Sequence, residues 1–151
     1  ALRQCALPPD CRITVVMGAT APWLEAVKTL AQHLPWPTRV LVGVSNMAQL
    51  MAESDLCIGA AGGSAWERCA LGLPALVLIL AANQHRGAMA LQSHGAALVA
   101  ADTQQLKSQM SELFTKNTQS AALKKMSQAA AKLAAGNGAS QVVELLFEPH
   151  V

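Results

Sequence analysis

The sequence predicts an α/β fold in which a doubly wound parallel sheet is covered by helices on both faces. Five short apolar segments alternate along the chain with segments of helical periodicity, which is typical of a parallel sheet with crossover helices. The fourth apolar segment, residues 74–80, shows no polar alternation, as expected of a strand buried on both faces. Of the 151 residues, 52% are hydrophobic and 13% are charged, which is enough apolar material for a full core.

The positions of the elements follow from the same patterns. Strands are expected where short apolar runs end at glycine or a polar turn, at residues 12–18, 38–44, 55–59, 74–80 and 96–100. Thr20 and Ser64 are the expected N-caps of the first and third helices, and Gly72 and Gly95 are the expected ends of the third and fourth helices. The helices are expected at residues 20–34, 45–54, 63–72, 84–95, 103–115, 120–135 and 138–147.

The opening residues suggest how the chain is organised. Residues 1–11 carry Pro8-Pro9 and no initiator Met, so we expect the remnant of an interdomain linker followed by one domain over residues 12–151. The low content of charged residues suggests that one face of this domain is buried against another domain or a second chain.

Composition excludes several classes of function. The net charge of +2, two Phe, three Trp and no Tyr disfavour binding of nucleic acid or of an anionic membrane surface. The longest apolar run, residues 75–82, is too short to span a bilayer. Four cysteines without a Cys-x-x-Cys pair predict buried, reduced thiols in a cytoplasmic protein, and no metal-ligand spacing or cofactor motif is present.

Two turns of small residues follow predicted strands and are candidate ligand sites. One begins at Gly18, and the other runs from Gly59 to Ser64 with Gly62 and Gly63 at its centre. Ligands bind at the carboxyl ends of such strands, and a glycine-rich turn before a helix suits a phosphate group. A tight strand-to-helix turn without any ligand is the plainer interpretation of each. Neither turn matches the dinucleotide or the P-loop fingerprint.

The polar side chains near these turns each allow two interpretations. Glu67 either completes a capping box with Ser64 or accepts hydrogen bonds from sugar hydroxyls. Trp66 is expected in the core or at a domain contact, and Arg68 as a solvated helix charge. Asn83 and Gln84 follow the fourth strand and suggest a ligand edge, although Asn83 could equally be a helix cap. His85, without a paired carboxylate or nucleophile, is a weak candidate catalyst.

The segment from Asp55 to Gln84 resembles a known family. It combines Trp-Glu-Arg-Cys at residues 66–69 with Gly-Leu-Pro at residues 72–74, after a Gly-Gly-Ser turn and before an Asn-Gln pair. This order is similar to that in the UDP-sugar hydrolases of pseudaminic acid biosynthesis. Residues 136–146 resemble the closing helix of the same family, so the resemblance covers residues 12–147.

The resemblance implies a fold, a ligand and a set of contacts. The family is similar to GT-B glycosyltransferases and to the peptidoglycan N-acetylglucosaminyltransferase, with two Rossmann-like domains, the C-terminal of which binds UDP. It implies that the backbone at Gly62, Gly63 and Ser64 meets the diphosphate and that Glu67 accepts the ribose hydroxyls. Asn83 and Gln84 would face the sugar, and the backbone around Val44 would contact the edge of the uracil. Gly18 would lie at the first turn. In that turn the family has a second Gly and an Asp, and this chain lacks both.

These implications give a main hypothesis and two alternatives. The main hypothesis is the UDP-sugar-binding domain of a hydrolase, inactive alone because the family's catalytic His lies in an N-terminal domain; His85 is not that residue. The N-terminal domain of the same polypeptide would then be its partner. The first alternative is the donor-binding domain of a glycosyltransferase, and the second is a non-catalytic α/β interaction module.

Overall fold

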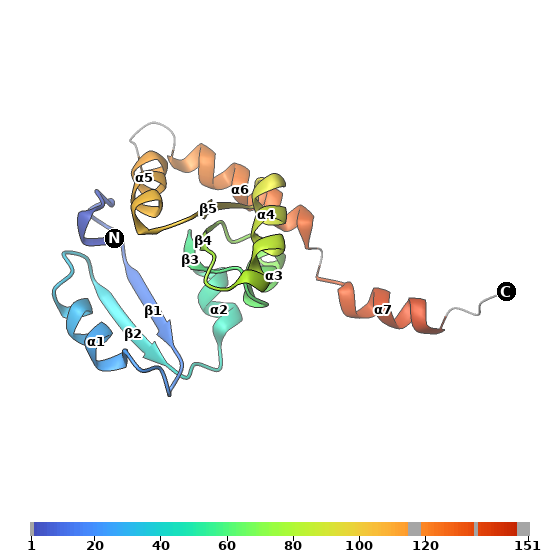
Figure 1. Ribbon diagram of the computed structural model, residues 1–151, viewed down its shortest axis with the longest axis horizontal. Coiled ribbons are helices and arrows are strands. Elements are labelled where there is room, and N and C mark those ends of the chain that lie inside the picture. Colours follow the sequence, from blue (N-terminus) through green and yellow to red (C-terminus); the bar gives the residue numbers. More distant parts are fainter. Residues whose placement is uncertain (1, 115–118, 135, 148–151) are drawn as a thin grey trace.

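The structure, a computed structural model, describes residues 2–114, 119–134 and 136–147, and it confirms the predicted α/β fold with parallel strands (Figure 1). All the described strand pairs are parallel. The strands are β1 (Ile13–Met17), β2 (Thr38–Val42), β3 (Cys57–Ala60), β4 (Ala75–Leu78) and β5 (Ala97–Ala100).

Helices connect the strands, largely where the sequence patterns predict them. The third and seventh of the expected helices begin at Ser64 and Gly138, within one residue of the expected starts. The helical elements are η1 (Leu2–Gln4), α1 (Leu24–Gln32), α2 (Met47–Ala52), α3 (Ser64–Ala70), η2 (Ala82–Gln84), α4 (His85–Ser93), α5 (Thr103–Leu113), α6 (Gln119–Leu133) and α7 (Gly138–Phe147).

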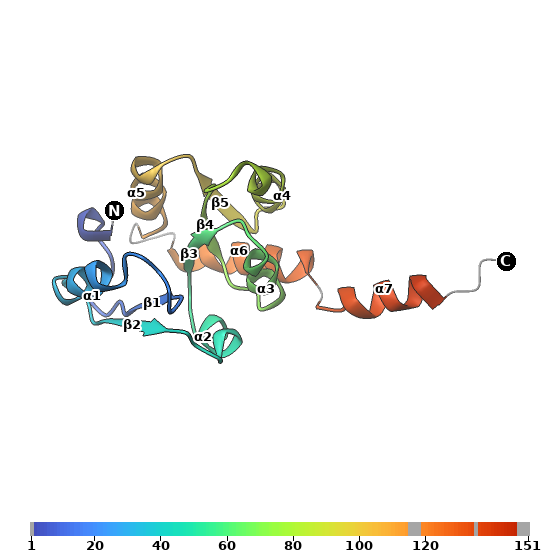
Figure 2. The ribbon, with the colours of Figure 1, turned by 60° about the horizontal axis from the view of Figure 1, so that its bottom comes forward.

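The strands form two sheets rather than the one continuous sheet expected from the sequence. β1 pairs with β2, and β3, β4 and β5 form a second sheet in that order. Figures 1 and 2 both show the β1–β2 sheet standing apart from the three-stranded sheet. An apolar pattern indicates that a strand is buried but does not encode which neighbour it pairs with, so this division could not be predicted.

The core lies on both faces of β4, as the absence of polar alternation predicts. Ala75 and Val77 pack on one face with side chains of α3, α4 and α6. Leu76 is fully buried on the other face, against side chains of α5 and α6. This double coverage holds the ends of the three-stranded sheet in fixed positions relative to the helices that follow them.

Two features of the N-terminal third concern the start of the first helix and the residues that precede β1. Thr20 does not cap the first helix, because α1 begins at Leu24 after a turn in which the Ala21 N–H donates to the Gly18 carbonyl. Cys5 is buried in the α5 side of the core, and Lys107 Nζ donates a 2.6 Å hydrogen bond to Gln4 Oε1. Residues of the segment expected to be an interdomain linker therefore contact the domain, and the boundary at residue 12 stays a prediction.

Candidate functional site

The turn between β3 and α3 carries three consecutive backbone N–H groups with no hydrogen-bond acceptor in the described part of the chain. They belong to Gly62, Gly63 and Ser64. The carbonyls of Gly62 and Gly63 are engaged, since they accept from the Ala65 and Trp66 N–H groups at 2.9 and 3.1 Å. The turn is therefore folded by its carbonyl groups and leaves its donors available to a ligand.

Neither glycine of this turn is required by its backbone conformation or by packing. Gly62 and Gly63 do not have positive φ angles, unlike Gly43, Gly72 and Gly95. A Cβ atom built on either of them would meet no atom within 4 Å. The plainer interpretation, a tight turn that only glycine can make, therefore does not explain these two residues.

The capping box proposed as one role of Glu67 is not formed. Ser64 is the first residue of α3, and Gly63 occupies the N-cap position of this helix. Because glycine has no side chain, no side-chain capping hydrogen bond is formed there. The Ser64 hydroxyl instead accepts a 3.3 Å hydrogen bond from Arg68 Nη1. Glu67 is exposed one turn above the free N–H groups, and no hydrogen bond of its carboxylate is found among the described residues.

Arg68 is buried, which contradicts its expected place as a solvated helix charge. Only 4% of the residue is exposed, because it lies on the same face of α3 as Ala65 and Cys69. Burial raises the pKa of the neighbouring Cys57 thiol, and the positive charge of Arg68 partly offsets this rise. The signal that sequence reasoning missed is spacing, since residues 65, 68 and 69 repeat at the interval of one helix face.

Asn83 and Gln84 lie at the end of the strand next to β3. Both belong to η2, which follows β4, and β4 pairs with β3 in register from Cys57 opposite Ala75. A Cβ atom on Gly87 in α4 would lie 3.9 Å from the Ala61 carbonyl oxygen, so the two connecting segments are neighbours. Asn83 is exposed, whereas Gln84 Oε1 accepts a 3.1 Å hydrogen bond from the Leu80 N–H.

Gly18 and Val44 lie together at the carboxyl end of the other sheet. The Gly43 N–H donates a 3.0 Å hydrogen bond to the Met17 carbonyl, which brings the residues that follow β1 and β2 side by side. The structure thus groups the predicted site residues in two places. Gly62, Gly63, Ser64, Glu67, Asn83 and Gln84 lie together, and Gly18 and Val44 lie on the separate sheet.

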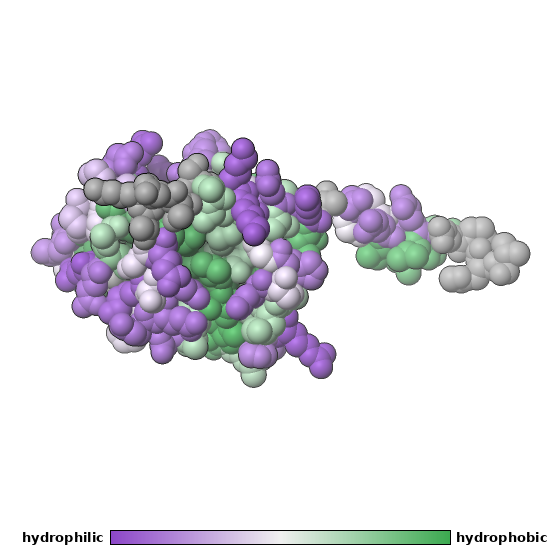
Figure 3. All heavy atoms as spheres, turned by 90° about the horizontal axis from the view of Figure 1, so that it is seen from above, coloured by the Kyte–Doolittle hydropathy of each residue, from purple (hydrophilic) through white to green (hydrophobic). Residues whose placement is uncertain are grey.

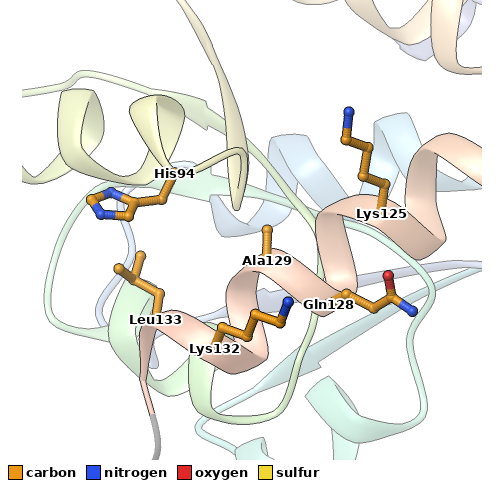
Figure 4. Close-up of a pocket in the computed structure, with 6 residues that line it drawn as sticks. All are labelled: His94, Lys125, Gln128, Ala129, Lys132 and Leu133. Atoms are coloured by element: carbon orange, nitrogen blue, oxygen red, sulfur yellow. The ribbon is translucent and has the colours of Figure 1, made fainter.

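A groove of about 510 Å³ lies elsewhere, between the C-terminal end of α4 and α6 (Figure 4). It is lined by His94, Lys125, Gln128, Ala129, Lys132 and Leu133. His94 follows α4 just before β5 begins, so the groove is at the amino end of that strand, opposite the glycine turns. None of the predicted site residues lines this groove.

The described residues contain neither a candidate metal site nor a helix that could span a membrane. No cluster of three or more His, Cys, Asp or Glu side chains that could hold a metal ion is present in residues 2–114, 119–134 and 136–147. Over the same residues, every helix is too short or too polar to cross a bilayer.

Comparison with known proteins identifies the family of this chain. Residues 10–143 match the glycosyltransferase family 28 C-terminal domain. The chain belongs to this family. Over 89 residues, 59% of this chain and 26% of the relative, it is 34% identical to the spore coat polysaccharide biosynthesis protein SpsG of Bacillus subtilis (strain 168).

Solved structures agree with this family and confirm the GT-B-like fold. The chain is similar to MurG of Acinetobacter baumannii with a TM-score of 0.75 and 26% identity, over 90% of this chain and 41% of that one. It shares its fold with WaaG, a glycosyltransferase involved in lipopolysaccharide biosynthesis, with a TM-score of 0.61 and 22% identity over 89% of this chain and 37% of WaaG. The chain therefore spans less than half the length of each of these relatives.

The family match corrects the main functional hypothesis from the sequence. The expected hydrolase activity is wrong, because the family that matches residues 10–143 is a glycosyltransferase family. The alternative of a glycosyltransferase donor domain fits the comparisons better. The motif around residues 66–74 led to the wrong enzyme class because a local motif on a shared fold does not by itself specify the reaction.

Proposed function

We propose that this chain is the donor-binding domain of a GT-B glycosyltransferase and that it holds a UDP-sugar at the carboxyl ends of β3 and β4. The observation that supports the proposal is the row of three N–H groups at Gly62, Gly63 and Ser64 that have no acceptor among the described residues. Two of them belong to glycines that neither the backbone conformation nor the packing requires. Backbone N–H groups that point into open space bind phosphate oxygens well, because they need no side-chain reorganisation.

The neighbouring side chains fit the rest of such a ligand. The exposed carboxylate of Glu67 is one turn from the free N–H groups and would accept hydrogen bonds from the ribose hydroxyls. Asn83 and Gln84, on the adjacent strand end, would face the sugar. Because Gln84 Oε1 already binds the Leu80 N–H, its amide nitrogen is the group left to donate to a sugar hydroxyl.

The assignment of the uracil to the backbone at Val44 rests on the resemblance alone, whereas a phosphate contact at Gly18 rests on the resemblance and on one structural observation. These residues lie on the β1–β2 sheet, apart from the other candidate residues. Gly18, like Gly62 and Gly63, has neither a positive φ angle nor any atom within 4 Å of a built Cβ, which supports a role in ligand approach rather than in the turn itself.

In transfer, the sugar leaves UDP for an acceptor, and negative charge grows on the diphosphate. The free N–H groups would stabilise that charge and so lower the barrier to departure. We propose a polysaccharide or its precursor as the acceptor class, since the relative SpsG is named for spore coat polysaccharide biosynthesis. The acceptor would be held by an N-terminal domain, as the partial coverage of the longer relatives suggests.

The surface of α7 supports such a partner domain. Its large apolar side chains are exposed to solvent, and their exposed fraction ranges from 53% for Val143 to 79% for Phe147. Figure 3 shows α7 projecting from the body with a hydrophobic face that no other described element covers. A partner domain would bury this face.

The test is a titration of ¹⁵N-labelled chain with UDP, monitored by two-dimensional amide NMR. We expect saturable shifts at residues 59–67 and 83–84. Binding should be about tenfold to a hundredfold weaker in Glu67→Ala, because a hydrogen bond to a charged group contributes about 1.5–3 kcal/mol. Glu112→Ala is the matched control, since Glu112 is an exposed glutamate on α5. Shifts confined to other residues, or equal weakening in both variants, would contradict the proposal.

A further inference from the structure

Arg68 is a buried charge without a neutralising partner. It is 4% exposed, and no ion pair of Arg68 is present in the described part of the chain, where the ion pair found is Lys28 with Glu25. Its Nε is also buried and has no hydrogen-bond acceptor there. Burial of an unpaired charge is costly, so a residue of this kind is expected where something outside the fold compensates for it.

The guanidinium holds both ends of the turn between β3 and α3. Nη2 donates a 2.7 Å hydrogen bond to the Ala60 carbonyl oxygen, the last residue of β3. Nη1 donates to the hydroxyl of Ser64, the first residue of α3, at 3.3 Å. One rigid, planar group therefore bridges residues 60 and 64 and fixes the span of the turn that carries the free N–H groups.

We propose that Arg68 is the positioning residue of this turn, and that its buried charge selects the diphosphate of the donor over a neutral ligand. The proposal rests on the function proposed above. Arg68 acts through the turn: it sets where the N–H groups of residues 62–64 point, and the ligand lies on their exposed side.

The charge matters in addition to the hydrogen bonds because of where it lies. A positive charge inside the protein is screened less than one in water, so it attracts an anion bound at the turn more strongly than a surface charge would. The adjacent Cys57 does not neutralise it, since burial raises the pKa of that thiol and favours its uncharged form. A diphosphate would supply the counter-charge that the fold lacks, whereas an uncharged nucleoside would not.

The discriminating experiment compares UDP with uridine in amide NMR titrations of this chain. Arg68→Met removes the charge and both hydrogen bonds at similar side-chain length, and Arg68→Lys keeps the charge but cannot bridge both acceptors. Arg39→Met is the control, because Arg39 is exposed on β2, carries the same charge and makes one side-chain hydrogen bond, to Thr14 Oγ1 at 2.9 Å.

We expect Arg68→Met to weaken UDP binding about tenfold or more, equivalent to about 1.4 kcal/mol, with uridine binding changed about threefold at most. The UDP affinity of Arg68→Lys should lie between those of Arg68→Met and the wild type. Arg39→Met should bind both UDP and uridine with the affinity of the wild type. Equal weakening of UDP and uridine would mean that Arg68 only maintains the fold, and unchanged UDP binding would mean that it has no role at the site. Either result overturns the proposal.

A second measurement tests the positioning role without a ligand. The amide N–H groups of Ala65 and Trp66 donate to the turn carbonyls, whereas the Leu73 N–H donates to the carbonyl of residue 68 at the other end of the helix. In Arg68→Lys, hydrogen exchange should accelerate at Ala65 and Trp66 and stay slow at Leu73. Uniform acceleration, or none, would contradict the proposal. Absence of both UDP and uridine binding in the wild type would instead refute the proposed function, whatever the exchange result.

Discussion

Nη2 of Arg68 donates a 2.7 Å hydrogen bond to the carbonyl oxygen of Ala60, eight residues earlier in the chain. This bond ties the last residue of β3 to the middle of α3 and determines how closely the strand end and the helix approach each other. It also leaves little room around the preceding residue. A Cβ atom on Gly59 would lie 3.3 Å from Arg68 Nη1.

The first prediction contrasts two glycines of the same segment. Gly59→Ala should lower the free energy of unfolding by about 1–3 kcal/mol, because the added methyl group forces a buried guanidinium to move. Gly62→Ala should change it by less than about 0.5 kcal/mol, because its Cβ meets open space. Urea unfolding followed by circular dichroism measures both values.

Gly62→Ala also distinguishes an effect on UDP binding from an effect on stability. Gly62→Ala, although stable, should weaken UDP binding, because its methyl group would stand where the ligand approaches the backbone. Equal UDP affinity in Gly62→Ala and the wild type would show that the ligand does not approach this residue.

The periodicity of the sequence was sufficient to predict the elements around the site. The lack of polar alternation over residues 75–78 correctly indicates burial on both faces, and the glycine-rich turn does lie at a strand's carboxyl end, beside the end of the neighbouring strand. These features are local, or follow directly from local apolar patterns, so the sequence alone was enough.

What could not be predicted depends on pairing and on competition between partners. The division into two sheets depends on which strands become neighbours, and no residue of β1 or β3 encodes this in its own pattern. The sequence predicts Ser64 as an N-cap, but its hydroxyl accepts a hydrogen bond from Arg68, four residues later. The sequence suggests that Arg68 is a surface charge because charged residues are seldom buried. The two hydrogen-bond acceptors that partly offset its burial, Ala60 O and Ser64 Oγ, are set by the folded turn and not by the local pattern.

The second prediction concerns Gly72, which ends α3 in a left-handed conformation with φ of +64°. A Cβ atom there would lie 3.3 Å from Ser127 Oγ and 3.5 Å from the Ser127 carbonyl oxygen on α6. Gly72→Ala should therefore lower the free energy of unfolding by about 1–2 kcal/mol from the backbone conformation alone, and by more from the contact. Adding Ser127→Ala should recover only the smaller, side-chain part; full recovery would mean that the backbone conformation carries no cost.

The third prediction is a loss of stability at alkaline pH. Burial raises the pKa of Cys57 and of Cys69, with Arg68 partly opposing each rise, and burial together with Asp10 and Asp55 raises that of Cys11. The unfolded chain therefore loses these protons first as the pH increases. Stability is full below the unfolded thiol pKa of about 8.5 and should fall above it, by up to about 1.4 kcal/mol per pH unit for a buried thiol such as Cys69. The contribution of Cys11 should be smaller, because this partly exposed thiol is screened by solvent.

Urea unfolding between pH 7 and pH 10 under reducing conditions measures this slope. Because lysines also begin to titrate in this range, the informative comparison is between the wild type and Cys57→Ala. The variant should lose less stability than the wild type between pH 8.5 and pH 10. Parallel curves for the two proteins would show that the Cys57 thiol is not shifted.

The fourth prediction uses α7 to test for a partner domain. Leu146 and Phe147 are 72% and 79% exposed, and no side chain of α7 is buried. In this chain alone, Leu146→Ser with Phe147→Ser should change the free energy of unfolding by less than about 0.5 kcal/mol and should reduce self-association measured by sedimentation, because the changes remove exposed apolar surface.

The opposite result is expected when the chain is joined to an N-terminal domain that covers α7. There the same two substitutions should destabilise the protein, by an amount comparable to the loss of buried apolar side chains, about 2–5 kcal/mol for each large residue that becomes fully buried. The control is Gln141→Ser, an exposed polar residue on the same helix, which should have little effect in either protein. If the double substitution is equally harmless in the longer protein, the exposed face of α7 is not the surface that meets the partner domain.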